Sequence, residues 1–274
     1  MKKIAVIGLG IIGASLARAL KRAGLSVDGF DMNSETLEYA LQMEYIDAPA
    51  TDVSAYDCVF LAIPPKAVIN ALENYTFKEN AFVADICGVK ECIENAVYSA
   101  PRNYRYIGLH PMAGKETSGI KSSSATLFCG ANLIITLAQG TRQSALEEAR
   151  EFARALGFGK IVECTAVEHD KKIALTSQLA HIVSNAYVKS GQVPHCDGFT
   201  GGSFQDMTRI AGVDEHMWTE LYMLNREHIL TELRGLIHEL SVYESAIEQG
   251  DEAALRDALA HGKAIRKKIK RKND

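Results

Sequence analysis

The sequence feature that most constrains the fold of this chain is a glycine-rich segment near its start, Gly8-Leu9-Gly10-Ile11-Ile12-Gly13. An apolar run at residues 3–7 precedes it, and residues 11–23 repeat apolar side chains at helical intervals. In such a strand, turn and helix, the first glycine permits the tight turn, the second lets the backbone approach a pyrophosphate, and the third lets helix and strand pack closely. The helix N-terminus adds N–H groups and partial positive charge. We therefore predict that all six residues bind a dinucleotide; a chance glycine-rich turn is the alternative.

An aspartate follows the next apolar run, which spans residues 27–30. Asp31 lies eighteen residues after Gly13, where an acidic side chain accepts hydrogen bonds from the adenosine ribose. Its charge would repel a 2′-phosphate, and no arginine occupies the next three positions. The sequence therefore predicts NAD rather than NADP, with an ordinary turn aspartate as the alternative. Pro64 ends the apolar run 58–63 at the edge where ligands bind, and we include it among the cofactor-binding candidates as a residue that shapes the loop.

Predicted strands and helices alternate over the first part of the chain and then give way to helices alone. The predicted strands are 4–7, 27–30, 58–63, 82–86, 106–109, 133–137 and 160–162, and the helices between them include 11–23, 35–43, 66–73 and 144–156. Later helical stretches span 168–189, 217–249 and 251–270. The alternation indicates a parallel α/β sheet. We expect an α/β Rossmann-type NAD-binding domain at residues 1–165, followed by an all-helical domain at residues 166–274 for substrate binding and dimerisation.

Long helices in a small second domain must bury wide apolar stripes, and a second copy of the chain is a common partner for them. We therefore expect a homodimer formed through the helical domain.

Composition excludes several other classes of function. With 47% hydrophobic and 23% charged residues, the chain has the composition of an ordinary globular protein. Its net charge of −4 argues against nucleic acid as a partner. No run of about 18 uncharged apolar residues occurs, so no membrane span is expected. The six cysteines show neither a Cys-x-x-Cys pair nor metal-ligand spacing to histidine, which predicts free thiols, a cytoplasmic location and no metal site.

A histidine stands at the end of the fifth predicted strand, in His110-Pro111-Met112-Ala113-Gly114. This position puts His110 at the carboxyl edge of the sheet, close to the expected nicotinamide. An imidazole has a pKa near neutrality, so His110 could remove a proton as a hydride leaves. A single histidine is also often structural, and position alone leaves both possibilities open.

Two later segments carry further motifs, Ser177-Gln178-Leu179-Ala180-His181 and Gly201-Gly202-Ser203-Phe204-Gln205-Asp206-Met207-Thr208-Arg209-Ile210-Ala211. Together with the segment at His110, and with Met217-Trp218 and Asn225, they resemble the motifs of the prephenate dehydrogenase family, in order and through nearly the whole chain.

The resemblance implies NAD-dependent oxidative decarboxylation of prephenate to 4-hydroxyphenylpyruvate in tyrosine biosynthesis, or of arogenate to tyrosine. It implies that His110 is the base at the ring hydroxyl and that Arg209 binds a substrate carboxylate, which suits a planar guanidinium. It further implies that Glu116 is a polar gate and that His181 lines the substrate site. The alternatives are an ion pair with Asp206 for Arg209 and a structural role for His181 and Glu116.

The sequence departs from the family pattern at several positions. Gly88 replaces a serine whose hydroxyl would share the ring oxygen with the histidine, so activation would depend more on His110. Gln178 replaces a second histidine, and Gln205 replaces a basic residue. These changes leave the choice between prephenate and arogenate open. Lys90 is expected to be solvated and Cys87 to be a buried thiol. The length predicts a monofunctional enzyme without a regulatory domain.

Two other classes remain as alternatives. A 3-hydroxyacid dehydrogenase or an imine reductase also joins a Rossmann domain to a helical domain, but the hydroxyacid enzymes rely on a lysine where this chain has residues 177–181. A non-catalytic NAD-sensing module would need the glycine segment and Asp31, but not His110 together with Arg209.

Overall fold

The computed structural model describes residues 2–114 and 117–269. One compact unit ends at Asn225 and a second begins at Arg226. The strands are β1 (Ile4–Ile7), β2 (Val27–Phe30), β3 (Cys58–Leu61), β4 (Phe82–Asp85), β5 (Arg105–Pro111), β6 (Asn132–Thr136) and β7 (Lys160–Cys164). The helices are α1 (Ile11–Arg22), α2 (Ser34–Gln42), α3 (Pro65–Asn74), α4 (Glu91–Tyr98), α5 (Gln143–Leu156), α6 (Ala166–Ile173), α7 (Ala180–Tyr187), α8 (Gly202–Thr208), α9 (Glu215–Leu224), α10 (Arg226–Glu248) and α11 (Glu252–Lys268).

All seven strands form one sheet in the order β2-β1-β3-β4-β5-β6-β7. The first five strands are mutually parallel, so their carboxyl ends share one edge. After β2 the chain passes over β1 to reach β3, so the strand order reverses at β1. In open α/β sheets, ligands bind beside such a reversal, outside the carboxyl ends of the strands. The prediction of a Rossmann-type domain followed by helices is confirmed for the described residues.

The prediction of a parallel sheet is wrong for its last part. β6 runs antiparallel to β5, with His110 opposite Ile134, and β7 follows the direction of β6. The described parts of the connection between β5 and β6 contain a 3₁₀ turn at Ile120–Ser122 rather than a crossover helix. The chain therefore re-enters the sheet at the edge where β5 ends. Hydrophobic periodicity finds strands but does not give their direction.

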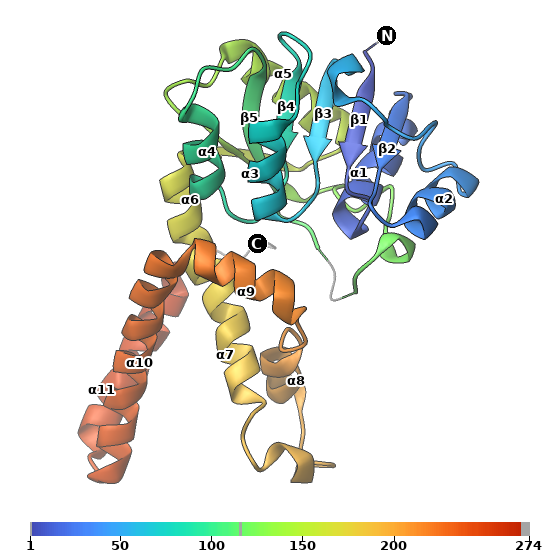
Figure 1. The fold of residues 1–274 in the computed structure, drawn as a ribbon. Coiled ribbons are helices and arrows are strands. Elements are labelled where there is room, and N and C mark those ends of the chain that lie inside the picture. The colour runs from blue at the N-terminus through green and yellow to red at the C-terminus, as the bar shows by residue number, and fades with distance from the viewer. Residues whose placement is uncertain (1, 115–116, 270–274) are drawn as a thin grey trace. The chain divides into compact units, whose positions relative to one another are not determined.

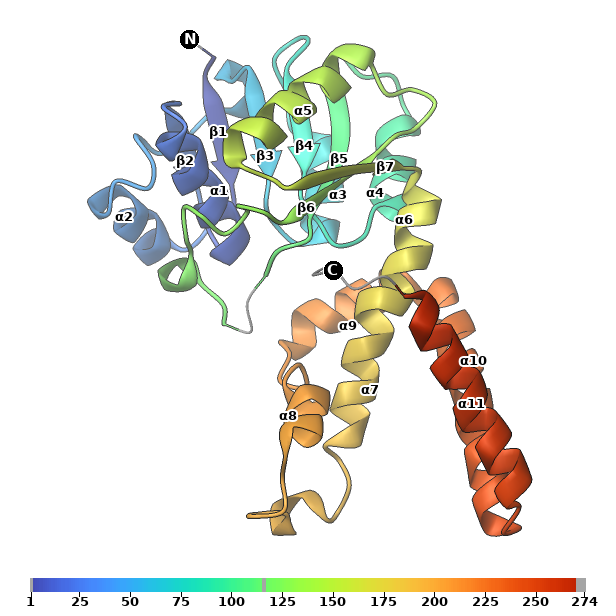
Figure 2. The same ribbon diagram turned by 180° about the vertical axis from the view of Figure 1, so that it is seen from behind.

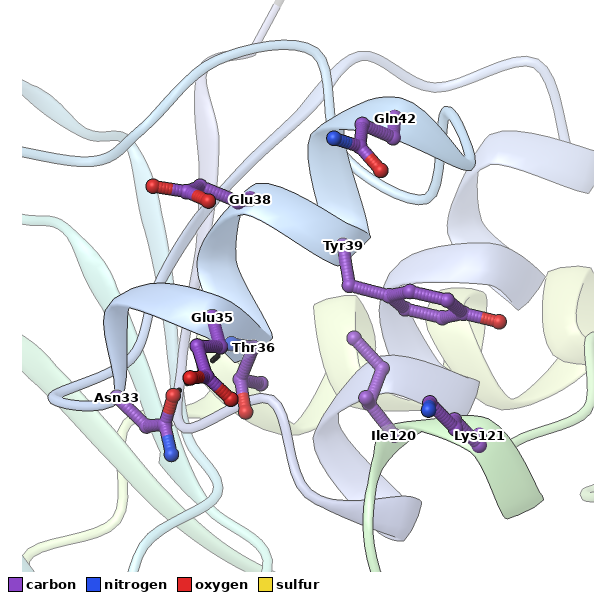
Figure 3. A pocket seen from close by; sticks show the side chains of 8 residues that line it. All are labelled: Asn33, Glu35, Thr36, Glu38, Tyr39, Gln42, Ile120 and Lys121. Carbon is purple, nitrogen blue, oxygen red and sulfur yellow. Dashed lines mark hydrogen bonds between the residues drawn. The ribbon is translucent and has the colours of Figure 1, made fainter.

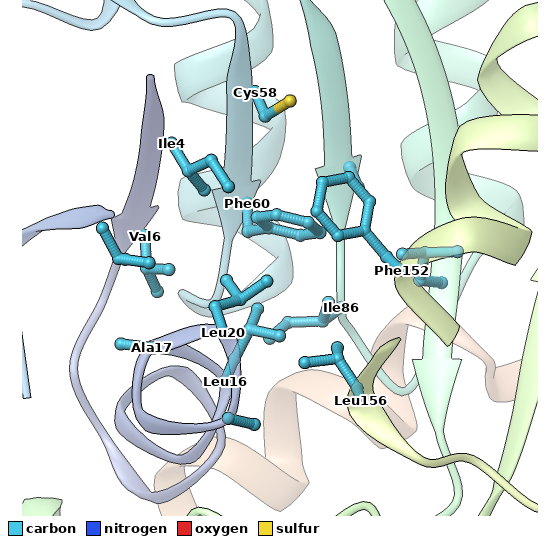
Figure 4. Packing of buried hydrophobic residues seen from close by; sticks show 14 of the residues in the cluster. Ile4, Val6, Leu16, Ala17, Leu20, Cys58, Phe60, Ile86, Phe152 and Leu156 are labelled. Carbon is cyan, nitrogen blue, oxygen red and sulfur yellow. The ribbon is translucent and has the colours of Figure 1, made fainter. Parts of the chain in front are cut away.

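Each face of the sheet carries its own apolar core. Helices α1 and α5 cover one face, where Leu16, Phe60 and Phe152 pack together (Figures 2 and 4). Helices α3 and α4 cover the other, where Val68 and Ile93 belong to the cluster (Figure 1). Because both faces are covered, the central strands β1, β3 and β4 are buried at every position, which is what continuous apolar runs predict.

Two predicted long helices are interrupted. The stretch 168–189 consists of α6, a π-helical segment at Ala174–Leu179 and α7. The stretch 217–249 divides at Asn225 into α9 and α10. No helix in the described part of the chain is long and apolar enough to span a membrane.

Candidate active site

The glycine segment forms the turn between β1 and α1. Gly8 has a φ of +92°, and a Cβ there would lie 2.4 Å from the carbonyl oxygen of Ala62. A Cβ at Gly13 would lie 1.9 Å from the carbonyl oxygen of Gly8. Any side chain at these two positions would therefore disrupt the turn. A Cβ at Gly10, in contrast, would meet nothing within 4 Å.

The open side of Gly10 lies at the N-terminus of α1, which begins at Ile11. The first N–H groups of a helix have no partner within the helix and favour an anion. The turn is closely packed at Gly8 and Gly13 and open at Gly10, and this shape fits a dinucleotide pyrophosphate.

Asp31 follows β2 beside this turn. One carboxylate oxygen accepts the N–H of Leu9 at 2.8 Å and the other accepts the N–H of Asn33 at 2.9 Å. These bonds fix the carboxylate at the place predicted for ribose recognition. A pocket of about 300 Å³ adjoins it between α2 and the turn at Ile120 (Figure 3). Two acidic side chains, Glu35 and Glu38, and one basic side chain, Lys121, line this pocket.

Pro64 is the exposed N-cap residue of α3, directly after β3. Its φ of −55° suits the start of a helix, and Pro65 follows at the first helical position. The structure thus places Pro64 in a shaped loop at the same edge of the sheet as the glycine turn.

His110 is the second-last residue of β5 and is half-buried. Its Nδ1 lies 2.8 Å from Nε2 of His169, which belongs to α6. The Nδ1 of His169 in turn lies 2.6 Å from Oδ1 of Asp170. His169 and Asp170 are each 1% exposed. A buried line of three side chains therefore ends at His110.

Burial lowers the pKa of His110 well below its usual value of 6.5, and the neighbouring His169 and Lys90 lower it further. The pKa of His169 is also lowered, chiefly by burial, although its bond to Asp170 opposes the shift. Both imidazoles are therefore neutral at pH 7, and a neutral imidazole is the form that can accept a proton.

Lys90, which neighbours His110, forms a buried ion pair. Lys90 is fully buried and its ammonium binds Asp85, which also accepts the hydroxyl of Tyr106 at 2.6 Å. The expectation of a solvated Lys90 is therefore wrong, because tertiary packing encloses the side chain against a matching carboxylate. Cys87 is buried, as expected, and burial raises its pKa well above the usual range.

Gly88 faces the free side of His110. A Cβ built on Gly88 would lie 3.7 Å from Nε2 of His110 and 3.9 Å from Cδ2 of Leu221 in α9. The position at which the family pattern has a serine is thus directly beside the second ring nitrogen. The missing side chain leaves space there.

Helix α9 contacts both the surroundings of Gly88 and helix α7, which carries the predicted site residue His181. Its Trp218 lies against the ring of His181 in α7, with the ring centroids 4.0 Å apart. Nδ1 of His181 lies 2.9 Å from the carbonyl oxygen of Ser177. Because Trp218 and Leu221 lie three residues apart on one helical face, α9 joins the surroundings of His181 to those of Gly88.

Arg209 directly follows α8 and is exposed. Helix α8 packs against α7, which carries His181. Glu116 lies outside the described residues. Gln178 is buried, and its side-chain oxygen accepts a hydrogen bond from Asn225 at 2.6 Å.

His169 and Asp170 were not predicted as site residues from the sequence. They lie in the first turns of a predicted helix, where polar residues are common. Their partner His110 is 59 residues away along the chain, so nothing local points to the contact. Among the described residues no group of three or more His, Cys, Asp and Glu side chains is placed to hold a metal ion.

Comparisons with known proteins match both parts of the chain to one family. The model of the prephenate dehydrogenase nucleotide-binding domain matches residues 16–162, and that of the prephenate dehydrogenase dimerization domain matches residues 165–261. The chain belongs to the prephenate dehydrogenase family. The prediction of this family is confirmed.

Individual relatives agree with that assignment. A prephenate dehydrogenase of Bacillus subtilis is 29% identical over 263 residues, which cover 90% of this chain and 71% of that protein. The crystal structure of a prephenate dehydrogenase from A. aeolicus, in complex with hydroxyphenyl propionate and NAD+, superimposes with a TM-score of 0.85 and 28% identity, covering 98% of this chain and 99% of that one. A Synechocystis arogenate dehydrogenase gives a TM-score of 0.77 and 27% identity over 97% and 99%.

The predicted enzyme class and cofactor are therefore confirmed: the chain is an NAD-dependent dehydrogenase of this family. The division at residue 165 and the roles of the individual site residues remain predictions.

Proposed function

We propose that this enzyme oxidises and decarboxylates prephenate to 4-hydroxyphenylpyruvate, with His110 as the base. The single observation that carries the proposal is the state of His110: it is a neutral imidazole at the carboxyl edge of the sheet, with its Nε2 beside the open space at Gly88. Family membership and the relatives that bear the prephenate dehydrogenase name support the choice of substrate.

The chemistry assigns one task to each part of the site. The ring hydroxyl gives its proton to Nε2 of His110 as hydride leaves the carbon that bears this hydroxyl. The bond from the ring to its carboxylate then breaks as CO₂ leaves, the ring becomes aromatic, and the phenolate oxygen takes the proton back from His110. NAD, when bound, accepts the hydride. The turn at Gly8, Gly10 and Gly13 would hold its pyrophosphate, and Asp31 would hold its adenosine ribose.

Residues of the helical part would bind the rest of the substrate. Arg209 can donate two parallel hydrogen bonds to a carboxylate. His181 and Trp218, whose ring centroids lie 4.0 Å apart, would form part of the wall around the ring. We retain Glu116 as a polar gate by its position in the sequence.

The test is to supply purified enzyme and NAD with prephenate, arogenate or a simple 3-hydroxyacid, and to follow the absorbance of reduced nicotinamide. We expect the highest kcat/KM with prephenate. Reduction of NAD with the 3-hydroxyacid and with neither cyclohexadienyl acid would overturn the proposal.

Arogenate is the second candidate substrate. It is favoured by the similarity to the Synechocystis arogenate dehydrogenase. The same assay decides between the two, because arogenate carries an amino group where prephenate has a ketone. A kcat/KM for arogenate at least tenfold above that for prephenate would assign the enzyme to arogenate.

We further propose that the enzyme is a homodimer. The family model that matches residues 165–261 is that of a dimerization domain. Helices α10 and α11 also expose large apolar side chains, among them Ile237, Leu240, Ile247, Leu259 and Ile265. Light scattering is expected to give twice the chain mass of 29.9 kDa. A cytoplasmic location without membrane or nucleic-acid partners fits the six free cysteines and the net charge of −4.

A further inference from the structure

The proposed reaction uses His110 but leaves the two groups behind it without a task. His169 and Asp170 are polar and buried, and burying such groups is costly unless they are paired. Their contacts are short and form one line from Asp170 through His169 to Nδ1 of His110.

The proton positions along this line follow from its last member. Both oxygens of Asp170 accept backbone N–H groups at 2.9 Å, Oδ1 from Lys90 and Oδ2 from Glu91. A carboxylate that only accepts requires the proton of His169 to be on Nδ1. Nε2 of His169 is then an acceptor, so Nδ1 of His110 must carry the proton of that ring. Nε2 of His110 is left with its lone pair facing the space at Gly88.

We propose that His169 and Asp170 are positioning residues that hold His110 in its Nδ1–H tautomer and so keep Nε2 ready to accept a proton. The proposal rests on the function proposed above, in which Nε2 is the base. It goes further by stating which residues make that nitrogen, rather than Nδ1, the reactive one.

His169 and Asp170 would also stabilise His110 after it has accepted the proton. When Nε2 takes a proton, His110 becomes a cation whose Nδ1–H still donates to His169, and the charge of Asp170 stabilises it through that ring. The carboxylate of Asp170 lies at the N-terminus of α4, where it accepts the backbone N–H groups of Lys90 and Glu91 and meets the partial positive charge of the helix.

Other ionisable groups lie near this line, and burial raises the pKa of Cys92 and of Glu94 among them. Lys90 is paired with Asp85, and Tyr106 also donates to Asp85. Cys87 is held protonated by burial, which raises its pKa. Asp170 is the carboxylate whose oxygen lies within hydrogen-bond distance of His169 and so ends the line of two imidazoles. Because Gly88 brings no hydroxyl to the substrate oxygen, the orientation of His110 rests on this line.

Two matched amides at position 169 test the tautomer argument. Glutamine places its amide near the position of Nε2 and can still accept from His110, whereas asparagine reaches only the position of Nδ1. We expect H169Q to stay within about threefold of the wild-type kcat and H169N to lose at least about tenfold, at similar KM, because a wrong tautomer disables such a base. Equal activities of H169Q and H169N, with equal thermal stability, would overturn the proposal.

The variant D170N tests the charge. Removing the anion should lower kcat and move the acidic limb of the kcat/KM profile to lower pH, because the His110 cation loses stabilisation. A purely structural role for Asp170 would lower the plateau without moving the limb, and that result would contradict the proposal.

A third measurement does not depend on activity. In wild-type protein labelled with [¹⁵N]histidine, we expect the ring of His110, assigned by its loss in H110N, to show the Nδ1–H tautomer above pH 8. An Nε2–H tautomer would refute the inference. If the enzyme turned over neither prephenate nor arogenate, the proposed function would fail while this spectrum still tested the positioning.

Discussion

At the scale of single residues, Gly88 is the position where one added hydroxyl group should change the chemistry. Its φ lies outside the left-handed region, and a Cβ there makes only ordinary contacts. A serine should therefore fit, with its hydroxyl within reach of the oxygen that Nε2 of His110 serves. We expect G88S to raise kcat up to roughly tenfold, the value of about one hydrogen bond.

The control for this change is G88A, which adds the Cβ without the hydroxyl. We expect it to leave kcat near the wild-type value. A gain of the same size in G88A would mean that packing, rather than the hydroxyl, is responsible.

Some of these residues could be predicted from sequence and others could not. Gly8, Gly13 and Asp31 were identified because their tasks are local, set by one turn and the strand beside it. His169 and Asp170 act across 59 and about 80 residues of chain, respectively. Their importance arises only when α6 packs beside β5 and α4, which no local pattern records.

At the scale of elements, the turn between β1 and α1 separates packing from binding within one motif. G13A would force its Cβ to 1.9 Å from a backbone oxygen, so we expect a loss of several kcal/mol in the free energy of unfolding. G10A meets nothing within 4 Å and should fold normally.

The G10A variant should instead be impaired in cofactor binding. A methyl group at residue 10 occupies the space that the pyrophosphate needs, so G10A should weaken NAD binding while its urea midpoint stays close to that of the wild type. NAD binding of wild-type strength in a stable G10A protein would place the pyrophosphate elsewhere.

There are physical reasons why some elements could not be predicted from the sequence. Helix α4 was not predicted because it is short and its N-terminus has no local side-chain cap; Asp170 binds the N–H groups of Lys90 and Glu91 instead. Helix α8 buries none of its residues and so shows no apolar stripe. The break at Asn225 was not predicted because the apolar periodicity continues through it. In the fold, the NH₂ group of Asn225 donates to the carbonyl oxygen of Asp170 and to the side-chain oxygen of Gln178.

At the scale of the whole molecule, the buried neutral histidines make stability depend on pH. Burial holds the pKa of His110 and of His169 below 6.5, so below that pH the unfolded chain binds more protons than the native protein. Their contribution is therefore complete above about pH 6.5 and declines as pH falls, by about 1.4 kcal/mol per pH unit for each histidine. Glu94, whose pKa is raised by burial, opposes this trend at the acidic end.

Comparing variants isolates the contribution of one histidine. Between pH 6.5 and 5, the free energy of unfolding of H110N should fall less steeply than that of the wild type, by about 1.4 kcal/mol per pH unit. Urea unfolding at several pH values measures both slopes. Identical slopes would show that His110 is not held neutral by the fold.

One measurement tests most directly whether His110 is the base in the oxidation of prephenate. It is the kcat/KM for NAD reduction by prephenate in the wild type, in H110N and in H216N, whose histidine is 94% exposed and serves as the control. We predict turnover by the wild type and H216N at equal rates and a loss of roughly 10²- to 10⁴-fold in H110N. Wild-type turnover by a correctly folded H110N would contradict the account.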